Sequence, residues 1–173
     1  MALWDEEDLL WRTGERADVE LPKRLKAGEP ATNLRRISQV IGRRTVDCIH
    51  DPYIGVKSLE NLLKLSELGV HLSPDLHLLG ATGSSIDSKA TAAFLRDLNI
   101  EKHSRWEMRT YCTPEKPHRR FLVCSDGSIV TCGLSLNNLN KDEVLELIPR
   151  DSELAKHDRT LFEEKWKLAV VLR

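Results

Sequence analysis

The amino-acid sequence predicts an α/β fold, with a mostly parallel or mixed sheet flanked by helices. Short apolar segments typical of strands alternate with amphipathic segments typical of helices, and the connections between them are short. A β-hairpin follows the last of these alternating strands. The chain has 173 residues, which suffice for one domain of ordinary size and an appended arm. We expect residues 1–30 to form an N-terminal arm or capping helix, and residues 31–173 to form the α/β domain.

The predicted arm is charged and interrupted by glycine and proline, but it contains one amphipathic stretch. Asp5–Trp11 has the spacing of a short helix, and Trp4 and Trp11 lie seven residues apart on one face of it. Such a helix packs on the domain as a cap, or it docks on a partner protein, because two tryptophans are costly to leave exposed. Both interpretations remain open.

The α/β domain is predicted to begin with a helix over Leu34–Ile41. Thr32 or Asn33 is the expected N-cap, since short polar side chains accept hydrogen bonds from the first turn. Gly42 follows the last apolar residue of the pattern and is expected to end the helix.

A strand is predicted from Thr45 onward, and it turns at Asp51, where an Asp-Pro pair favours a turn. We expect the Asp51 carboxylate to bond the backbone of that turn. An amphipathic helix follows over Leu59–Leu68, with Ser58 as its N-cap and Gly69 at its end.

The same alternation continues downstream. Leu76–Ala81 is a second apolar strand, and Lys89–Leu98 is a helix capped by Asp87 or Ser88. Trp106–Cys112 alternates like a third strand. Strands separated by helices are typical of parallel pairing.

A β-hairpin comes next, with arms at residues 118–124 and Ile129–Cys132 and an Asp-Gly pair in the turn. Side chains two residues apart on a strand share a face, so His118 and Arg120 point the same way. Beyond the hairpin, Asn140–Glu146 is a polar tail. Leu161–Leu172 has the spacing of a closing helix whose apolar face lies on the sheet.

Polar groups also follow the second arm of the hairpin. After Gly133, the spacing of two residues aligns Ser135 with Asn137. If the arms pair, these two side chains converge with His118 and Arg120 on one pocket. Positive charge and several hydrogen-bond donors suit a phosphate group.

The composition excludes a polycation that coats nucleic acid. Lys and Arg number 26 and Asp and Glu number 27, so the formal net charge is -1 and nucleic-acid binding requires a local patch. Basic residues at 35–36, at 43–44 and at 116–120 form such a patch or are simply solvated. No apolar run reaches the roughly 18 residues of a membrane span. The acidic N-terminus is unlike a signal peptide, so we expect a cytoplasmic protein.

The four cysteines lie singly, without a Cys-x-x-Cys pair. We expect buried thiols rather than a metal site or a disulfide framework. They are Cys48, Cys112, Cys124 and Cys132.

The hairpin and the segment after it resemble the motif of the phospholipase D superfamily, a His-x-Lys pair followed by an Asp and a Gly-Ser-x-Asn turn. His118 and Arg120 match the pair, Asp126 the acidic residue, and Gly133 through Asn137 the turn.

Upstream segments extend this resemblance. Ile49–Ile54, the leucine-rich helix after it and Leu76–Leu79 are similar to the opening strand, helix and strand of single-motif bacterial members. The likeness covers about residues 44–170 and implies a single phospholipase D-like repeat.

The resemblance implies a metal-independent phosphodiesterase without a cofactor, in particular a nuclease. In the family's mechanism one His attacks the phosphodiester, a second His protonates the leaving oxygen, and Lys and Asn hold the other oxygens. His118 is then the nucleophile or the acid, and Arg120 replaces the Lys. Ser135 and Asn137 line the phosphate. The further residues expected to contact substrate are Arg119, Asp126 and Gly133.

The chain carries one motif, so two catalytic histidines imply a homodimer joined across a two-fold axis. His157, which has Arg159 two residues later, is a weaker candidate for a second half-site because it lies in a predicted helix approach. Asp126 and Gly133 each lie one residue later than the family spacing, and Leu134 stands where Ser is expected. A degenerate domain that recognises phosphate or another protein, without turnover, is therefore the alternative to an enzyme.

Overall fold

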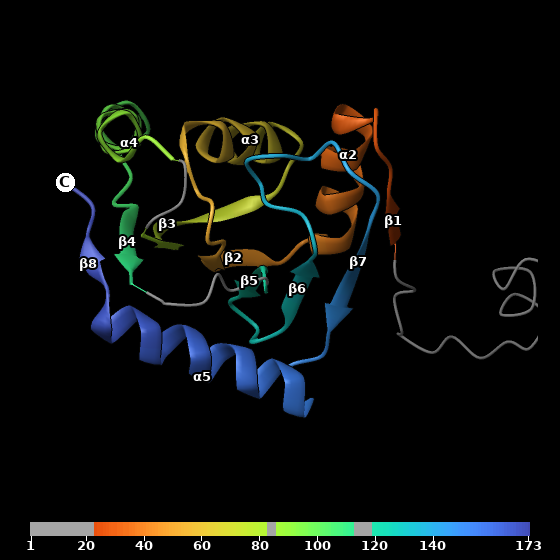
Figure 1. Cartoon of the computed structure of the whole chain (residues 1–173). Coiled ribbons are helices and arrows are strands. Elements are labelled where there is room, and N and C mark those ends of the chain that lie inside the picture. The colour runs from red at the N-terminus through yellow and green to blue at the C-terminus, as the bar shows by residue number, and fades with distance from the viewer. Residues whose placement is uncertain (1–22, 83–85, 113–118) are drawn as a thin grey trace, which may run out of the picture.

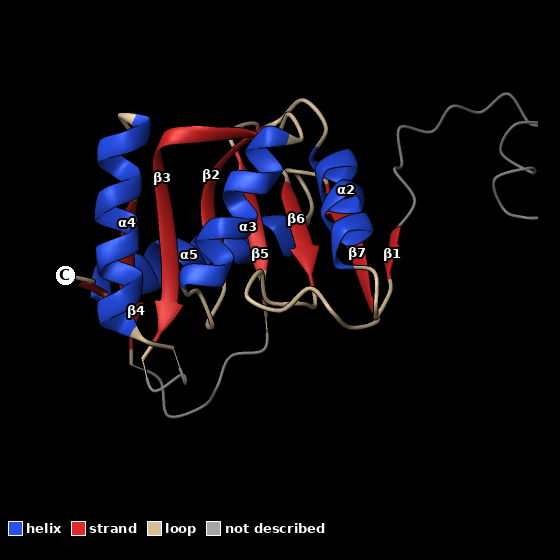
Figure 2. Cartoon of the chain, turned by 90° about the horizontal axis from the view of Figure 1, so that it is seen from above, coloured by secondary structure: helices blue, strands red, loops and turns tan. Residues whose placement is uncertain are grey.

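The computed structural model describes residues 23–82, 86–112 and 119–173. Within these ranges the chain forms one mixed sheet of eight strands, in the order β1-β7-β6-β5-β2-β3-β4-β8. Helices α2, α3 and α4 cover one face of the sheet and α5 covers the other (Figure 1). Seen from above, α4, α3 and α2 follow one another across the sheet (Figure 2). This is the predicted α/β class with a mixed sheet.

The parallel pairings lie toward the β8 edge of the sheet, where β2 pairs with β3 and β3 with β4. The other pairings are antiparallel, including the predicted hairpin of β5 and β6. The strands are β1 (Lys23–Leu25), β2 (Thr45–His50), β3 (His71–Ala81), β4 (Glu107–Tyr111), β5 (Phe121–Cys124), β6 (Ile129–Cys132), β7 (Glu143–Ile148) and β8 (Val170–Val171).

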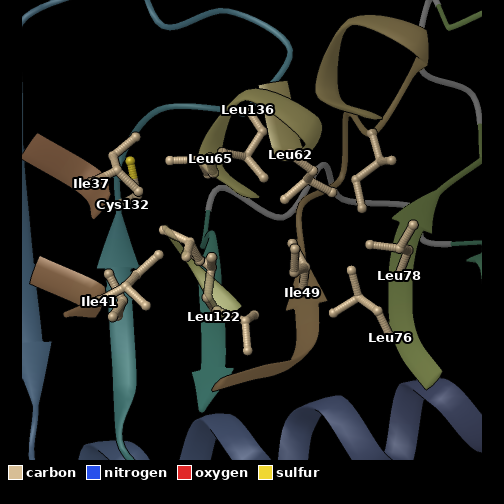
Figure 3. Close-up of a cluster of buried hydrophobic side chains, with 14 of the residues drawn as sticks. Ile37, Ile41, Ile49, Leu62, Leu65, Leu76, Leu78, Leu122, Cys132 and Leu136 are labelled. Carbon is tan, nitrogen blue, oxygen red and sulfur yellow. The ribbon is translucent and has the colours of Figure 1, made fainter. Parts of the chain in front are cut away.

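Two hydrophobic clusters hold the helices to the sheet. The larger lies under α2 (Pro30–Ile41), α3 (Val56–Glu67) and α4 (Ser88–Lys102), and Figure 3 shows some of its side chains, among them Ile37 and Ile41 of α2 and Leu62 and Leu65 of α3. The smaller lies under α5 (Glu153–Leu168). Alternate residues of β5 enter the two clusters, as a strand with two covered faces requires.

Helix α2 begins four residues before the predicted start, and its N-cap is Glu29, without a capping side chain. Pro30 suits the first turn because its fixed φ is helical and it has no N–H to leave unsatisfied. Asn33, predicted as a cap, is instead buried inside the helix, where its amide bonds the backbone of Lys26 and Leu139. The predicted cap was wrong, but Gly42 ends the helix as expected, at φ 61°.

Helix α3 also begins early, because Gly55 occupies the N-cap position. Ser58, predicted as the cap, lies at N3, where its hydroxyl accepts the Gly55 N–H at 3.2 Å. Leu68, the last residue of the predicted helix, instead follows α3 as its C-cap and is 44% exposed, whereas Leu65 is buried. Gly69 follows at φ 90°, a conformation that favours glycine, and the chain leaves the helix there as predicted.

The next elements agree with prediction but are longer. The second predicted strand is β3, which starts at His71. Asp87 is the N-cap of α4 and accepts the Ala90 N–H at 3.0 Å, so of the two candidate caps Asp87 serves. The helix continues to Lys102.

The C-terminal region departs most from prediction. The polar tail contains the start of β7, where Leu145 and Ile148 are buried and Glu143 is half-buried. Helix α5 begins at Glu153, capped by the Ser152 hydroxyl, and ends at Leu168. The last apolar residues of the predicted helix therefore form β8 instead, which pairs with β4.

All four cysteines are free thiols, as expected, but only Cys124 and Cys132 are buried. Cys48 is half-buried, and Cys112 is exposed because it follows the end of β4. In the described part of the chain, no helix has the length and apolar character needed to cross a membrane.

Part of the predicted arm belongs to the sheet, since β1 pairs with β7. Residues 1–22, with the predicted helix Asp5–Trp11 and Trp4, lie outside the described residues.

Candidate phosphate-binding site

An open cavity of about 470 Å³ lies at one end of the sheet. Strand β6 ends just before Gly133, Arg120 directly precedes β5, and Glu143 begins β7. Because neighbouring strands of this hairpin are antiparallel, the end of one meets the start of the next, and residues distant in sequence become neighbours. The cavity is lined by Tyr53, Ile86, Arg120, Gly133, Leu134, Ser135, Asn137, Asn138, Lys141 and Glu143.

Four of the predicted site residues line this cavity, namely Arg120, Gly133, Ser135 and Asn137. Ser135 and Asn137 reach the cavity from a loop and turn after β6, not from an extended strand as the two-residue spacing assumed. His118 lies outside the described residues.

The structure does not bring Arg119 and Asp126 to the cavity lining. The Arg119 guanidinium makes two hydrogen bonds of 2.6 and 2.5 Å to the fully buried carboxylate of Asp158 on α5. Asp126 lies in the turn after β5, at the other end of the hairpin. There its carboxylate accepts the Ser128 N–H and hydroxyl and pairs with Arg44 at 3.2 Å.

Arg120 is held in one orientation by three neighbours. Its Nη1 donates to the Gly133 carbonyl at 2.7 Å, and its guanidinium lies 5.3 Å from the centre of the Tyr53 ring. Its Nε lies 3.8 Å from Oδ1 of Asp51. The Arg120 side chain is only 16% exposed, so its charge is fixed at the wall of the cavity.

Asp51 fixes the loop after β6 to the end of β2. Its Oδ2 accepts the Ser135 hydroxyl and the Leu136 N–H, each at 2.8 Å, and its Oδ1 accepts the Tyr53 N–H at 3.0 Å. Burial raises the pKa of the Asp51 carboxyl, while these three donors and Arg120 act against that rise. The turn role predicted for Asp51 is confirmed, and it extends to a second loop.

The loop that carries Ser135 and Asn137 is anchored from both sides. The Ser135 oxygen accepts the Asn137 N–H at 3.1 Å, and the buried Asn61 amide donates to the Leu136 carbonyl at 2.8 Å. Three leucines of the loop are buried in the larger cluster, and so leave their polar neighbours at the cavity. They are Leu134, Leu136 and Leu139.

Glu143 approaches the backbone of Gly133 closely. A Cβ at position 133 would meet the end of the Glu143 side chain, so a larger residue there displaces that carboxylate. The Glu143 carboxylate accepts the Val144 N–H at 3.1 Å and faces the cavity, which also contains Arg120 and Lys141. The site thus contains one positive charge held in place, that of Arg120, a second one on the exposed Lys141, and the negative charge of Glu143.

His50 belongs to a separate buried cluster on the α5 face. One ring nitrogen bonds the Arg119 carbonyl at 2.9 Å, the other bonds the Tyr111 hydroxyl at 2.8 Å, and the ring stacks on Phe121. Burial is the main reason that the pKa of His50 is lowered to about 4, and burial also raises the pKa of Tyr111 to about 12. His50 is therefore neutral at physiological pH and does not line the cavity.

Sequence reasoning missed four polar lining residues, Tyr53, Asn138, Lys141 and Glu143. Tyr53 was visible only as a turn residue, although it lies two positions after Asp51. Lys141 and Glu143 fell in the polar tail, and only the pairing of β7 with β6 brings them to the cavity.

The cavity suits an anion with several oxygen atoms, because a guanidinium, an ammonium and side-chain amides surround it, while the Ser135 hydroxyl proton is already donated to Asp51. No group of three or more His, Cys, Asp or Glu side chains is arranged to hold a metal ion in residues 23–82, 86–112 and 119–173.

The fold is similar to those of two solved bacterial proteins. Nuc from Salmonella typhimurium, a phospholipase D family member, is 13% identical, with a TM-score of 0.57 over 88% of this chain and 98% of that one. NucT from Helicobacter pylori is 12% identical, with a TM-score of 0.52 over 87% of this chain and 99% of that one. The sequence matches no family model and no curated protein.

Proposed function

We propose that this chain, which has a phospholipase D-like fold, binds phosphodiesters in the cavity beside Arg120 and cleaves them. The observation that carries the proposal is the convergence of Arg120, Ser135 and Asn137 at one end of the sheet, where the motif resemblance requires them. The expected substrate is a nucleic acid, and the expected mechanism needs no metal ion.

In this proposal the non-bridging oxygens of the phosphate lie between Arg120 and the Ser135–Asn137 loop. The Arg120 guanidinium neutralises their charge, and its contacts with Gly133 and Tyr53 orient it before substrate binds. Lys141 supplies a second positive charge at the rim of the same cavity.

The covalent step is assigned to His118. A ring nitrogen of the neutral imidazole attacks phosphorus, a P–N bond forms, and the P–O bond to the leaving group breaks. A protonated histidine gives its proton to the leaving oxygen. The same histidine then takes a proton from water, which hydrolyses the phospho-histidine and restores His118.

The second histidine is expected from a second copy of the chain. Each of the five histidines other than His118 lies within the described ranges, and none of them lines the cavity. His157 is exposed on α5, which covers the opposite face of the sheet from α2 to α4. We therefore propose a homodimer in which two copies of His118 meet across a two-fold axis.

A second candidate function is recognition of a phosphate group without turnover. The placement of Glu143 favours it, because a carboxylate over Gly133 repels a phosphodiester. The Arg120 fork is also already engaged with the Gly133 carbonyl and lies near Asp51. The predicted partner-binding role of the N-terminal arm is compatible with either function.

One experiment separates the two functions. Wild-type protein and His118→Ala are incubated with bis-p-nitrophenyl phosphate in EDTA, and His157→Ala serves as the matched control. Cleavage by wild type and by His157→Ala, but not by a folded His118→Ala, is expected of the enzyme. Cleavage that survives His118→Ala refutes the assignment, and binding of phosphate without any cleavage supports the second candidate.

A further inference from the structure

Positive charge is concentrated in the first described segment of the chain. Residues 23–44 contain seven Lys and Arg and one Glu, although the whole chain has a formal net charge of -1. This segment comprises β1, α2 and the connections between and after them. Both views place β1 and α2 together at one edge of the sheet (Figures 1 and 2).

Not all of this charge is available to a ligand. Arg36 pairs with Glu29 at 3.4 Å, and Arg44 pairs with Asp126 at 3.2 Å. Arg24 is exposed, but it alternates with Lys23 along β1 and so points to the opposite face of the sheet.

Four basic residues remain and form what we call the α2 track. Lys26, Arg35 and Arg43 are exposed, and no side-chain ion pair joins them to other described residues. Lys23 reaches the outer face of α2, where its Nζ donates to Gln39 at 3.1 Å. Gln39 lies four residues after Arg35, so the two share one exposed stripe of the helix.

The α2 track begins at the cavity. Leu25 pairs with Glu143, so Lys26 lies at the end of the sheet where the cavity opens. The loop around Lys26 is joined to the loop that carries Lys141, since Ala27 N–H donates to the Asp142 carboxylate at 2.9 Å. The buried Asn33 amide bridges the same two loops.

The track then runs along α2 to the far end of the sheet. Arg35 lies in the middle of the helix, and Arg43 follows its C-cap, close to the hairpin turn that binds Arg44. Because Arg43 lies beyond the C-terminal end of α2, the two guanidinium groups are placed to contact different phosphates of one strand.

The chemistry of this surface favours a polyanion over a lipid membrane. None of the large exposed hydrophobic side chains lies on α2, whereas a helix that binds a membrane surface buries an apolar face in it. A row of exposed Lys and Arg is the ordinary means of holding a phosphate backbone.

We propose that the α2 track binds the sugar-phosphate backbone of a nucleic acid and leads one strand to the cavity. This rests on the proposed function for the identity of the cavity as a phosphodiester site. The track makes a polymer, rather than a small phosphodiester, the preferred substrate. Sequence preference is not expected, because contacts to phosphates carry no base information.

The test compares binding of a fluorescent single-stranded DNA of 20 nucleotides to the wild-type chain and to Arg35→Glu/Arg43→Glu. The matched control is Arg96→Glu/Lys102→Glu, which makes the same change of charge at exposed positions of α4, near the opposite edge of the sheet from β1 and α2. Affinity is measured by anisotropy over a series of salt concentrations, and hydrolysis of bis-p-nitrophenyl phosphate is measured in parallel.

The α2 variant is expected to bind DNA on the order of tenfold more weakly at low salt. The slope of the logarithm of its binding constant against the logarithm of the salt concentration should be smaller by about 1.4, because two phosphate contacts are lost. The control variant and the hydrolysis of the small diester should be unchanged. If both variants weaken DNA binding equally, or if the wild-type chain does not bind DNA, the proposal that the α2 track binds nucleic acid is refuted. Failure of the cavity proposal is seen separately, as absence of small-diester hydrolysis in the wild-type chain.

Discussion

The carboxylate of Asp51 accepts the Ser135 hydroxyl at 2.8 Å, although 84 positions separate the two residues in sequence. This contact joins the end of β2, in the parallel part of the sheet, to the loop after β6, in the antiparallel hairpin. The same carboxylate lies near Arg120. The position of the cavity residues therefore depends on one buried acidic side chain.

Asp51→Asn should lower the free energy of unfolding by about 1–3 kcal/mol, because an amide cannot accept all three donors and one buried backbone N–H loses its partner. Ser135→Ala leaves both backbone donors bonded and should cost less, about 1 kcal/mol. Urea denaturation measures both. Equal losses in the two variants would show that Asp51 does not organise these loops.

Arg119→Ala should destabilise the fold by about 3 kcal/mol, because it leaves the fully buried Asp158 carboxylate without its partner. The value is at the low end for buried pairs, since the Arg119 side chain is 38% exposed and partly screened. Arg119→Ala/Asp158→Asn should recover part of the loss. If Arg119 contributes through substrate instead, its removal lowers binding of the small diester and leaves the denaturation midpoint unchanged.

His50 predicts a loss of stability in acid. Its pKa is about 4 in the folded chain and about 6.5 when unfolded, so the unfolded state takes up the proton first. The neutral His50 therefore contributes fully to the free energy of unfolding above pH 6.5. As pH falls from 6.5 to 4, the free energy of unfolding decreases by roughly 3 kcal/mol. His50→Gln, which does not titrate, is less stable at pH 7 and should lose correspondingly less over that range. Parallel curves for the two proteins would contradict this account.

Glu143→Gln should strengthen binding of inorganic phosphate by roughly fivefold, because one unit of repulsion at the cavity is worth about 1 kcal/mol in a partly solvated site. Titration calorimetry measures the change. Glu146→Gln is the control, since it removes the same charge from β7 at a residue outside the cavity lining. A gain of equal size in both variants would indicate general electrostatics rather than a carboxylate at the site.

The sequence predicted the fold where periodicity is strong. The predicted hairpin is present as β5 and β6, and Leu122 and Cys124 enter one hydrophobic cluster while Phe121 and Val123 enter the other, as the two-residue period of a strand requires. Helix starts were less predictable, because Pro30 and Gly55 begin helices without the polar cap side chain that the pattern requires. Strand β7 was not predicted, because the segment begins with polar residues and only Leu145 and Ile148 of it are buried.

The candidate site divides in the same way. Arg120, Ser135 and Asn137 were predicted from the motif, which is local, although Ser135 and Asn137 lie in a loop with a turn rather than in the predicted strand alternation. Lys141 and Glu143 reach the cavity only because Cys132 pairs with Leu145, and nothing in the local sequence specifies that register. Arg119 and Asp126 lie within the motif, but their side chains bond Asp158 and Ser128 away from the cavity.

The central claim is that phosphodiester cleavage proceeds through a covalent phospho-histidine at His118. Rapid quenching of the wild-type chain with bis-p-nitrophenyl phosphate, followed by mass spectrometry of its peptides, tests this directly. We expect an acid-labile nitrophenyl-phosphoryl group on the peptide that contains His118, and no such group in His118→Ala. Cleavage that proceeds without any adduct on His118, or an adduct on another residue, would contradict the account.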